Sequence, residues 1–294
     1  MPAESACKPL GKGYEGFREF FSRYCAEQAN PGSNPDLALS LNALDSEDAR
    51  SIVRRVGTRP LCLIQGITCP RNGVALRQYL EQAADQKNGA AQNGAVHPDI
   101  HGIDIMDVAT LAREAGTELA HVSFTVGDAA RMERWADGSV DVLVQDHLLN
   151  CAPHGSHEAI LREAARVLSS RGVMILNFSV EPEAEEPRLS WHEARQLLGA
   201  SLTEQAYCLR DIVGDEGIEE ARRNFIGRVI SDSTRGRELV VTAPYGNFEF
   251  YFPLERLQRT LDRMGLRFLV TRRVPGAKCV RYRTLVERIA EAAG

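Results

Sequence analysis

The stretch that decides the fold is SVDVLVQDHLLNCAPHGSHEAILREAARVLSSRGVMILNFS, from Ser139 to Ser179. Its first part, SVDVLVQDH, is a short apolar run that predicts a buried strand ending in an acid and a histidine. A helix is predicted over HEAILREAARVLSSRG, because the apolar residues recur at helical spacing: Ile160, Leu161, Ala164 and Leu168. GVMILNFS is again typical of a buried strand. Strand, helix and strand in this order predict a parallel sheet.

The same alternation extends toward the N-terminus, so that strand and helix alternate at least four times between residues 59 and 179. This pattern predicts a doubly wound sheet that binds ligands at the carboxyl ends of its strands. The predicted strands are Leu61–Ile64, Gly102–Ile105, Val122–Thr125, Val140–Val144 and Val173–Asn177. Polar residues at their ends should meet at one edge: Gln65, Asp104, Asp128, Asp146 and His147.

The flanking segments predict additions to this core. Helices are expected at YEGFREFFSRYCAEQ and at DSEDARSIVRRVG, the latter capped by Asp45 and stopped by Gly57. Residues 188–235 are predicted mostly as helix, and RELVVTAPYGNFEFYFP as a hairpin turning at PYGN. After the helix FPLERLQRTLDRMG, the strands LRFLVTRR and CVRYRTLVER could pair at the sheet edge. We therefore expect an N-terminal extension (1–57), a core (58–180), an inserted cap (181–252) and the C-terminal part of the core (253–294).

Composition and charge exclude several classes of partner. A formal net charge of −5 gives no basic footprint for nucleic acid. No apolar run approaches the roughly 18–20 residues of a membrane helix, and the N-terminus has no secretory signal. The seven cysteines are scattered and form no CxxC pair, which favours reduced thiols in the cytoplasm.

Four stretches resemble the class I S-adenosylmethionine (SAM) methyltransferases. The segment Asp137–Ser179 is similar to the family's region from strand four to strand five, and HGIDI and VGDA resemble its second and third strand ends. FPLERLQRTLDRMGLRF is similar to the helix and strand before the last strand. The resemblance covers Arg59 to Arg288 apart from the insertion after Glu181. It implies an α/β Rossmann-like sheet of seven strands, mostly parallel and ending in an antiparallel strand, here with a helical N-terminal extension and an inserted helical and hairpin cap.

The resemblance also implies where SAM binds. Asp104 fits the acid that accepts hydrogen bonds from the ribose hydroxyls, with Ile105 next to it. Asp128 fits the acid that meets the adenine amino group, with Ala129 beside it. Gly66 and Gln145, at the ends of strands one and four, complete the predicted cofactor contacts. A carboxylate can accept from both hydroxyls of a ribose. Each aspartate could instead be a strand-end cap.

The first loop departs from the family's pattern. Gly66 keeps the first glycine, but Ile64 replaces an acid, and Thr68 and Pro70 replace later glycines. Proline fixes φ and removes an amide donor, so the loop cannot hold the cofactor in the family's usual way. Gly73 could restore one turn. Arg71 could meet a carboxylate or simply be an exposed cation.

Strand four also delivers the catalytic candidates, Asp146 and His147. Histidine is the side chain best suited to act as a general base near neutral pH, although His147 could equally be packed at a strand end. Cys151, His154 and His157 have the spacing of metal ligands, but no distant pair completes them, so we predict no metal. Trp191 and His192 would roof the site from the cap.

Three functions compete on this reading. The first is a SAM-dependent methyltransferase that acts on a small molecule, in the biosynthesis of a secondary metabolite. The second is a related enzyme that no longer transfers methyl and catalyses an elimination, cyclisation or rearrangement in the same cleft. The third is a degenerate subunit that stabilises a partner. The acids at strands two and three favour the first, and the altered loop favours the other two. A homodimer or a partner subunit is compatible with each.

Overall fold

The apolar runs of the sequence form one seven-stranded sheet in the computed structural model of the chain. The structure describes residues 41, 44–67, 71–85, 95–105, 107–114, 116, 118–151, 156–179, 188–189, 227–232, 236–240, 254–273 and 281–289. The predicted helix at YEGFREFFSRYCAEQ, the linker EPEAEEP and the turn PYGN lie outside these residues.

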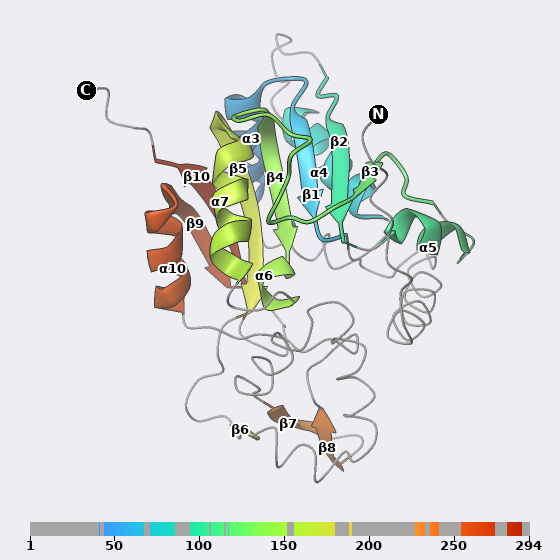
Figure 1. The fold of residues 1–294 in the computed structure, drawn as a ribbon, viewed down its shortest axis with the longest axis vertical. Coiled ribbons are helices and arrows are strands. Elements are labelled where there is room, and N and C mark those ends of the chain that lie inside the picture. Colours follow the sequence, from blue (N-terminus) through green and yellow to red (C-terminus); the bar gives the residue numbers. More distant parts are fainter. Residues whose placement is uncertain are drawn as a thin grey trace.

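The strands of this sheet lie in the order β3-β2-β1-β4-β5-β10-β9 (Figure 1). They are β1 (Leu61–Gln65), β2 (Asp99–Asp104), β3 (Ser123–Val126), β4 (Val140–Asp146), β5 (Leu168–Ser179), β9 (Leu266–Arg273) and β10 (Arg281–Arg288). The first five are parallel, whereas β10 runs antiparallel to both β5 and β9. The predicted Rossmann-like sheet and its antiparallel terminal pair are therefore confirmed.

The chain builds the sheet outward from β1 to β3 and then returns to place β4 on the other side of β1. In doubly wound sheets the crevice at such a reversal, beyond the carboxyl ends of the strands, is where ligands bind. The fold therefore puts the candidate site at the ends of β1 and β4.

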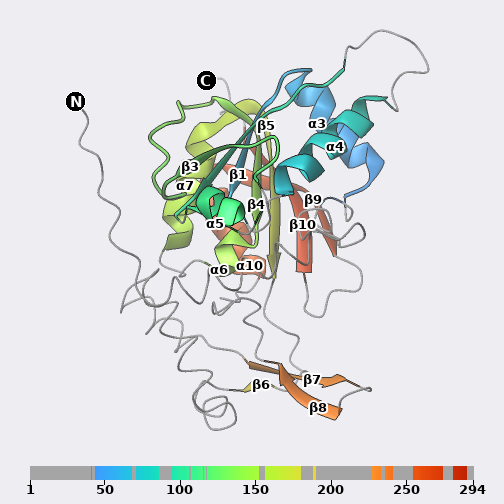
Figure 2. The same ribbon diagram turned by 90° about the vertical axis from the view of Figure 1, so that its right-hand side faces the viewer.

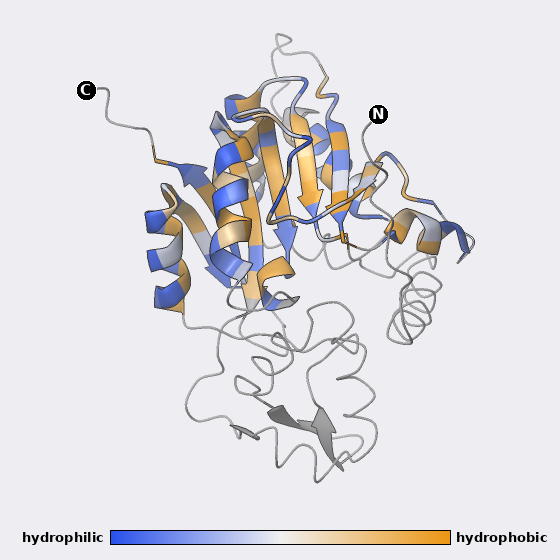
Figure 3. Cartoon of the chain, viewed as in Figure 1, coloured by the Kyte–Doolittle hydropathy of each residue, from blue (hydrophilic) through white to orange (hydrophobic). Residues whose placement is uncertain are grey.

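Helices cover both faces of the sheet (Figures 1 and 2). One core contains apolar residues of α3 (Ser46–Val56), α4 (Asn72–Asp85) and α5 (Val108–Glu114). The other contains residues of α7 (His157–Val167) and α10 (Leu254–Arg263). Because the central strands are buried on both faces, they are apolar over most of their length (Figure 3).

The ends of α3 agree with the sequence. Asp45 is its N-cap, and its side chain accepts hydrogen bonds from the amides of Glu47 and Asp48. The Asp48 carboxylate in turn accepts a hydrogen bond from the amide of Asp45. Gly57 follows the helix with φ of +81°, a conformation that favours glycine. A reciprocal cap of this kind fixes the start of the helix, which local sequence alone could encode.

One local prediction needs correction. Leu168 and the SSRG segment after it belong to β5 rather than to the preceding helix, because pairing with β4 outweighs the local helical pattern. Of residues 188–235, predicted mostly as helix, the structure describes only β6 (Arg188–Leu189) and β7 (Gly227–Asp232). The strand β8 (Gly236–Val240) lies within the predicted hairpin and pairs antiparallel with β7. The rest of these two segments lies outside the described residues, so both stay predictions.

Candidate active site

The carboxyl edge of the sheet brings together the predicted site residues. Asp104 is the last residue of β2, Asp128 follows β3 by two residues, and His147 directly follows β4. Since β1 to β4 are parallel, all three lie at the same edge of the sheet, beside the reversal between β1 and β4. The five strands β1 to β5 run parallel, as predicted from the sequence.

Asp104 connects the end of β2 to the first loop. Its Oδ2 accepts a hydrogen bond from the Ile67 amide at 3.0 Å, and its carbonyl accepts one from the Gly127 amide at 2.8 Å. Gly66 donates from its amide to the Ile103 carbonyl at 2.9 Å and has φ of +73°. Only glycine takes that conformation without strain, so the retained glycine has a structural reason. Asp104 thus holds the start of the altered loop against β2.

Two apolar side chains lie exposed beside these acids. Ile105, which follows Asp104, is 50% exposed, and Val126, which pairs with Asp104 across the sheet, is 43% exposed. Large aliphatic side chains normally lose this surface to the core. Here they border two carboxylates at a strand edge, which suits a ligand with an apolar ring and polar groups.

Asp128 serves as a turn cap in this structure. Its Oδ1 accepts from the Ala130 amide at 2.8 Å, and its carbonyl accepts from the Arg131 amide at 2.9 Å. The Asp128 side chain is otherwise exposed, while Ala129 is buried in the core on the α7 side of the sheet. Capping and ligand binding are compatible, because a carboxylate can accept several hydrogen bonds at once.

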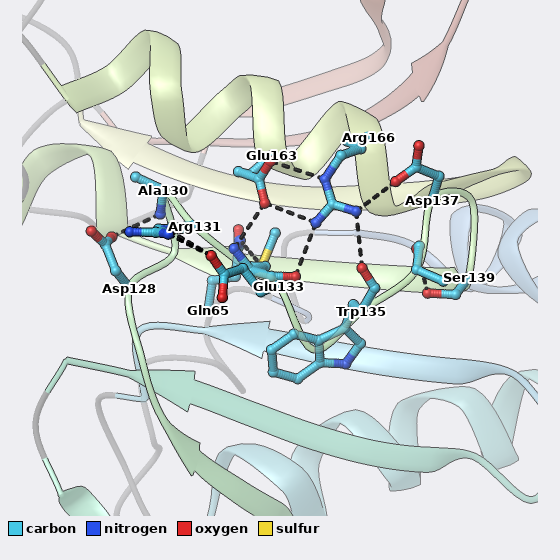
Figure 4. A network of polar contacts seen from close by, with 12 residues as sticks. Gln65, Asp128, Ala130, Arg131, Glu133, Trp135, Asp137, Ser139, Glu163 and Arg166 are labelled. Atoms are coloured by element: carbon cyan, nitrogen blue, oxygen red, sulfur yellow. Dashed lines mark hydrogen bonds and ion pairs between the residues drawn. The ribbon is translucent and has the colours of Figure 1, made fainter. Parts of the chain in front are cut away.

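A network centred on Arg166 of α7 holds the loop after Asp128 (Figure 4). Its guanidinium donates to the carbonyls of Met132 and Trp135, each at 2.9 Å, and pairs with Asp137 at 2.6 Å. Glu163 pairs with Arg166 at 2.8 Å and accepts from the Met132 amide at 2.8 Å. One helix therefore fixes the loop that presents Asp128. The sequence alone did not single out this arginine.

This network makes a pH prediction. The hydrogen bond from Arg166, followed by that from the Met132 amide, outweighs desolvation and lowers the pKa of Glu163 below its ordinary 4.5. A carboxylate with a lowered pKa in the folded state contributes stability above its unfolded pKa and loses it as pH falls through the folded pKa. Urea unfolding should show wild-type stability falling more steeply with acid below about pH 4.5 than that of Glu163→Gln. Equal slopes for the two proteins would contradict this role.

Asp146 and His147 lie at the end of β4, next to the last buried residues of β5. Asp146 is only 2% exposed and accepts through Oδ1 from the Asn177 side-chain amide, its partner in register. His147 is 9% exposed, donates from its amide to the Asn177 carbonyl at 3.1 Å, and has φ of +55°. Residues other than glycine rarely adopt this conformation, and such outliers cluster at functional sites.

Gln145 lies at the same edge but faces the interior. It is fully buried, and its side-chain nitrogen donates to Gln65 Oε1 at 2.5 Å. Gln65 in turn lies against Met132 Sδ at 2.9 Å. Neighbouring residues of a strand face opposite sides of the sheet, so Gln145 points away from Asp146. Its contact with a cofactor stays a prediction.

Sequence reasoning missed two buried polar residues of this edge. Asn177 of β5 is 1% exposed and holds Asp146, and Arg283 of β10 is fully buried and lies opposite Asn177. Asn177 could have been found as the single amide in the apolar run GVMILNFS. Arg283 could not, because only the pairing of β10 with β5 places it there.

The structure separates the other candidates. Arg71 is exposed, just before α4, and Gly73 is buried, where an added Cβ would lie 2.2 Å from Val122 Cγ2. That clash gives Gly73 a packing role in the helix, distinct from a role in the loop. Thr68, Pro70, His154, Trp191 and His192 lie outside the described residues.

The CxxHxxH segment is only partly described. His157 begins α7 and is 7% exposed, whereas the Cys151 side chain lies outside the described part. Within the residues that the structure does describe, no group of three potential metal ligands is found. No helix in that part is long and apolar enough to cross a bilayer.

The family comparison concerns this same region of the chain. Residues 87–176 match the family described as the methyltransferase domain. The match spans β2 to β5 nearly to its end and so contains Asp104, Asp128 and His147. The resemblance to class I methyltransferases is thereby confirmed at the level of the domain and of its Rossmann-like sheet.

The solved structures that are similar to this chain have low sequence identity to it. A SAM-dependent methyltransferase from Methanosarcina mazei is 16% identical, with 82% of this chain and 97% of that one covered at a TM-score of 0.44. A TehB-like SAM-dependent methyltransferase from Corynebacterium glutamicum is 12% identical, with 93% of this chain and 99% of that one covered at a TM-score of 0.48.

A third structure, 1,6-didemethyltoxoflavin-N1-methyltransferase from Burkholderia thailandensis, is 12% identical, with 98% of this chain and 93% of that one covered at a TM-score of 0.45. None of these three TM-scores reaches 0.5. The comparison with curated proteins gives no match.

Proposed function

We propose that the chain is a SAM-dependent methyltransferase that acts on a small molecule in the biosynthesis of a secondary metabolite. The observation that carries the proposal is the meeting of Asp104 and Asp128 at one sheet edge, within the methyltransferase domain and beside the reversal between β1 and β4. The partly exposed Ile105 and Val126 next to them supply apolar surface for a ring.

These residues fit an adenosine group. A ribose diol offers two hydroxyl donors to a carboxylate such as Asp104, and an adenine amino group offers a donor to Asp128. The apolar side chains of Ile105 and Val126 lie where a base could cover them. When bound, SAM supplies an electrophilic methyl group on a sulfonium sulfur.

His147 and Asp146 are proposed to act on the acceptor. A histidine at this edge can take the proton of an acceptor hydroxyl or amine as it is methylated. Asp146 is held by Asn177 and directly precedes His147, so the end of β4 is fixed in place. Such a rigid strand end favours precise positioning of the acceptor, which is the main requirement of group transfer.

The proposal predicts that Asp104→Asn weakens SAM binding about tenfold to hundredfold, the loss of charge-assisted hydrogen bonds worth roughly 1.5–3 kcal/mol. Asparagine keeps an oxygen for the Ile67 amide, so the first loop should remain attached to β2. The measurement is calorimetric titration with SAM and with S-adenosylhomocysteine. Asp262→Asn, at an exposed position of α10, is the matched control. No binding by wild type at millimolar SAM would reject the proposal.

A second candidate is an enzyme of the same fold that catalyses an elimination, cyclisation or rearrangement without transferring methyl, either alone or together with a partner subunit or a second copy of the chain. It is favoured by Ile64, which is 1% exposed and packed in the core on the α3 side, where the family has an acid. Mass spectrometry of the product separates the two candidates, because only methyl transfer releases S-adenosylhomocysteine in step with product.

A further inference from the structure

A polar cavity lies at the opposite, amino edge of the sheet. It has a volume of about 370 Å³ and is formed by the end of α3 and the starts of β4 and β5. Its charged and hydroxyl-bearing lining residues are Arg54, Arg55, Asp141, Ser169, Ser170 and Arg171. The cavity is therefore remote from Asp104 and His147, which lie at the carboxyl ends of β2 and β4.

The single carboxylate of this lining is committed to the fold. Asp141 Oδ2 accepts from the Leu61 amide at 3.0 Å, and its Oδ1 accepts from the Ser169 hydroxyl at 3.1 Å. It therefore holds the starts of β1 and β5 to β4. Three arginines against one engaged aspartate leave the cavity positive, although the whole chain has a formal charge of −5.

Two of the arginines already have anionic partners. Arg54 pairs with Glu47, whose side chain is 59% exposed, and exposed pairs of this kind contribute little and exchange readily with other anions. Arg55 pairs with Glu287 at 2.6 Å, and that carboxylate is shared with Arg267. Within the described residues, the carboxylates of Glu47 and Glu287 are thus each shared by two arginines.

Arg171 is the lining arginine for which the fold shows no structural role. It is exposed at the start of β5, and within the described residues its guanidinium has no ion pair or hydrogen bond. Arg54 and Arg55 lie in the last turn of α3 and complement the negative end of the helix dipole. The helix dipole does not explain Arg171, which lies on a strand 116 residues after Arg55. The Arg171 carbonyl accepts a hydrogen bond from Arg55 Nε at 3.4 Å.

We propose that this cavity binds the phosphate group of a small phosphorylated molecule. Planar guanidinium groups match the oxygens of phosphate better than any other cation in proteins, and the exposed Ser170 hydroxyl adds a donor. The volume lies within the range of small-molecule sites and exceeds what a single phosphate needs, so there is room for the rest of a phosphate ester. The ligand would sit across the edge formed by α3, β4 and β5.

The test is calorimetric titration of the full chain with inorganic phosphate and, separately, with ribose 5-phosphate, at constant ionic strength in chloride. Wild type should bind saturably, and Arg171→Gln should weaken binding about tenfold, the effect of losing one charge-assisted hydrogen bond. Because the Arg171 side chain makes no ion pair or hydrogen bond with the described residues, this variant should unfold at the wild-type temperature. Tighter binding of ribose 5-phosphate identifies an ester as the ligand, and equal binding identifies free phosphate.

Arg259→Gln, at an exposed position of α10, is the control and should bind phosphate as wild type does. The proposal is overturned if neither probe binds, if sulfate and chloride at equal ionic strength act as well as phosphate, or if Arg259→Gln weakens binding as much as Arg171→Gln. Competition between phosphate and SAM would also overturn it, because it would place the anion at the carboxyl edge.

Discussion

Phe178→Ala should lower the free energy of unfolding by about 3–5 kcal/mol, as expected for removing a fully buried aromatic side chain. Phe178 of β5 has no exposed surface. Its ring stacks on Tyr282 of β10 with centroids 5.8 Å apart and on Phe268 of β9 with centroids 6.3 Å apart. The substitution therefore leaves a cavity at the joint between the parallel strands and the antiparallel pair. Chemical denaturation of the variant measures the loss.

Phe268→Ala is the matched control for this cavity. Phe268 is only half-buried, so its removal should cost clearly less than that of Phe178. A loss below about 1 kcal/mol for Phe178→Ala would mean that β9 and β10 do not pack on β5 as the structure has them. Because Asn177 precedes Phe178 and holds Asp146, the same variant should also weaken the candidate site.

Arg166→Ala should lower the free energy of unfolding by about 2–4 kcal/mol, because it removes the cationic partner of the partly buried Glu163 and the hydrogen-bond donor of two backbone carbonyls. The hydrogen bond to Glu163, and after it the one to Asp137, raises the pKa of the Arg166 guanidinium above its ordinary value. The loop that presents Asp128 should loosen, so SAM affinity should fall together with stability.

Arg166→Lys and Arg131→Ala give the comparison. Lysine keeps the charge but cannot bridge two carbonyls and two carboxylates at once, so it should recover only part of the loss. Arg131 forms an exposed pair with Glu133 in the same loop, and its removal should change stability by less than about 1 kcal/mol. Denaturation and SAM titration of the three variants distinguish the effect of Arg166, which holds the loop, from that of Arg131, which only carries a surface charge. Equal losses for Arg166→Ala and Arg131→Ala would contradict the role of Arg166.

The sequence by itself determined the elements and the edge at which the site lies. Apolar runs such as LCLIQ and VDVLVQD could only be buried strands, and β9 begins and ends at the predicted residues. Parallel strands separated by helices place their last residues at one edge, which is why Asp104, Asp128 and His147 could be grouped without a structure. These are consequences of local periodicity and of the geometry of the strand–helix–strand connection.

Only the tertiary structure decided which distant residues meet. The Asn177 contact with Asp146, the anchoring of the Asp128 loop by Arg166 and the approach of Arg171 to α3 each join separate elements. The start of β5 at Leu168 was likewise set by its pairing with β4, against a local helical pattern. The pairing of β7 with β8 also joins segments that the sequence did not connect. Local sequence fixes backbone preference within a few residues, whereas these contacts depend on how whole faces bury their apolar surface together.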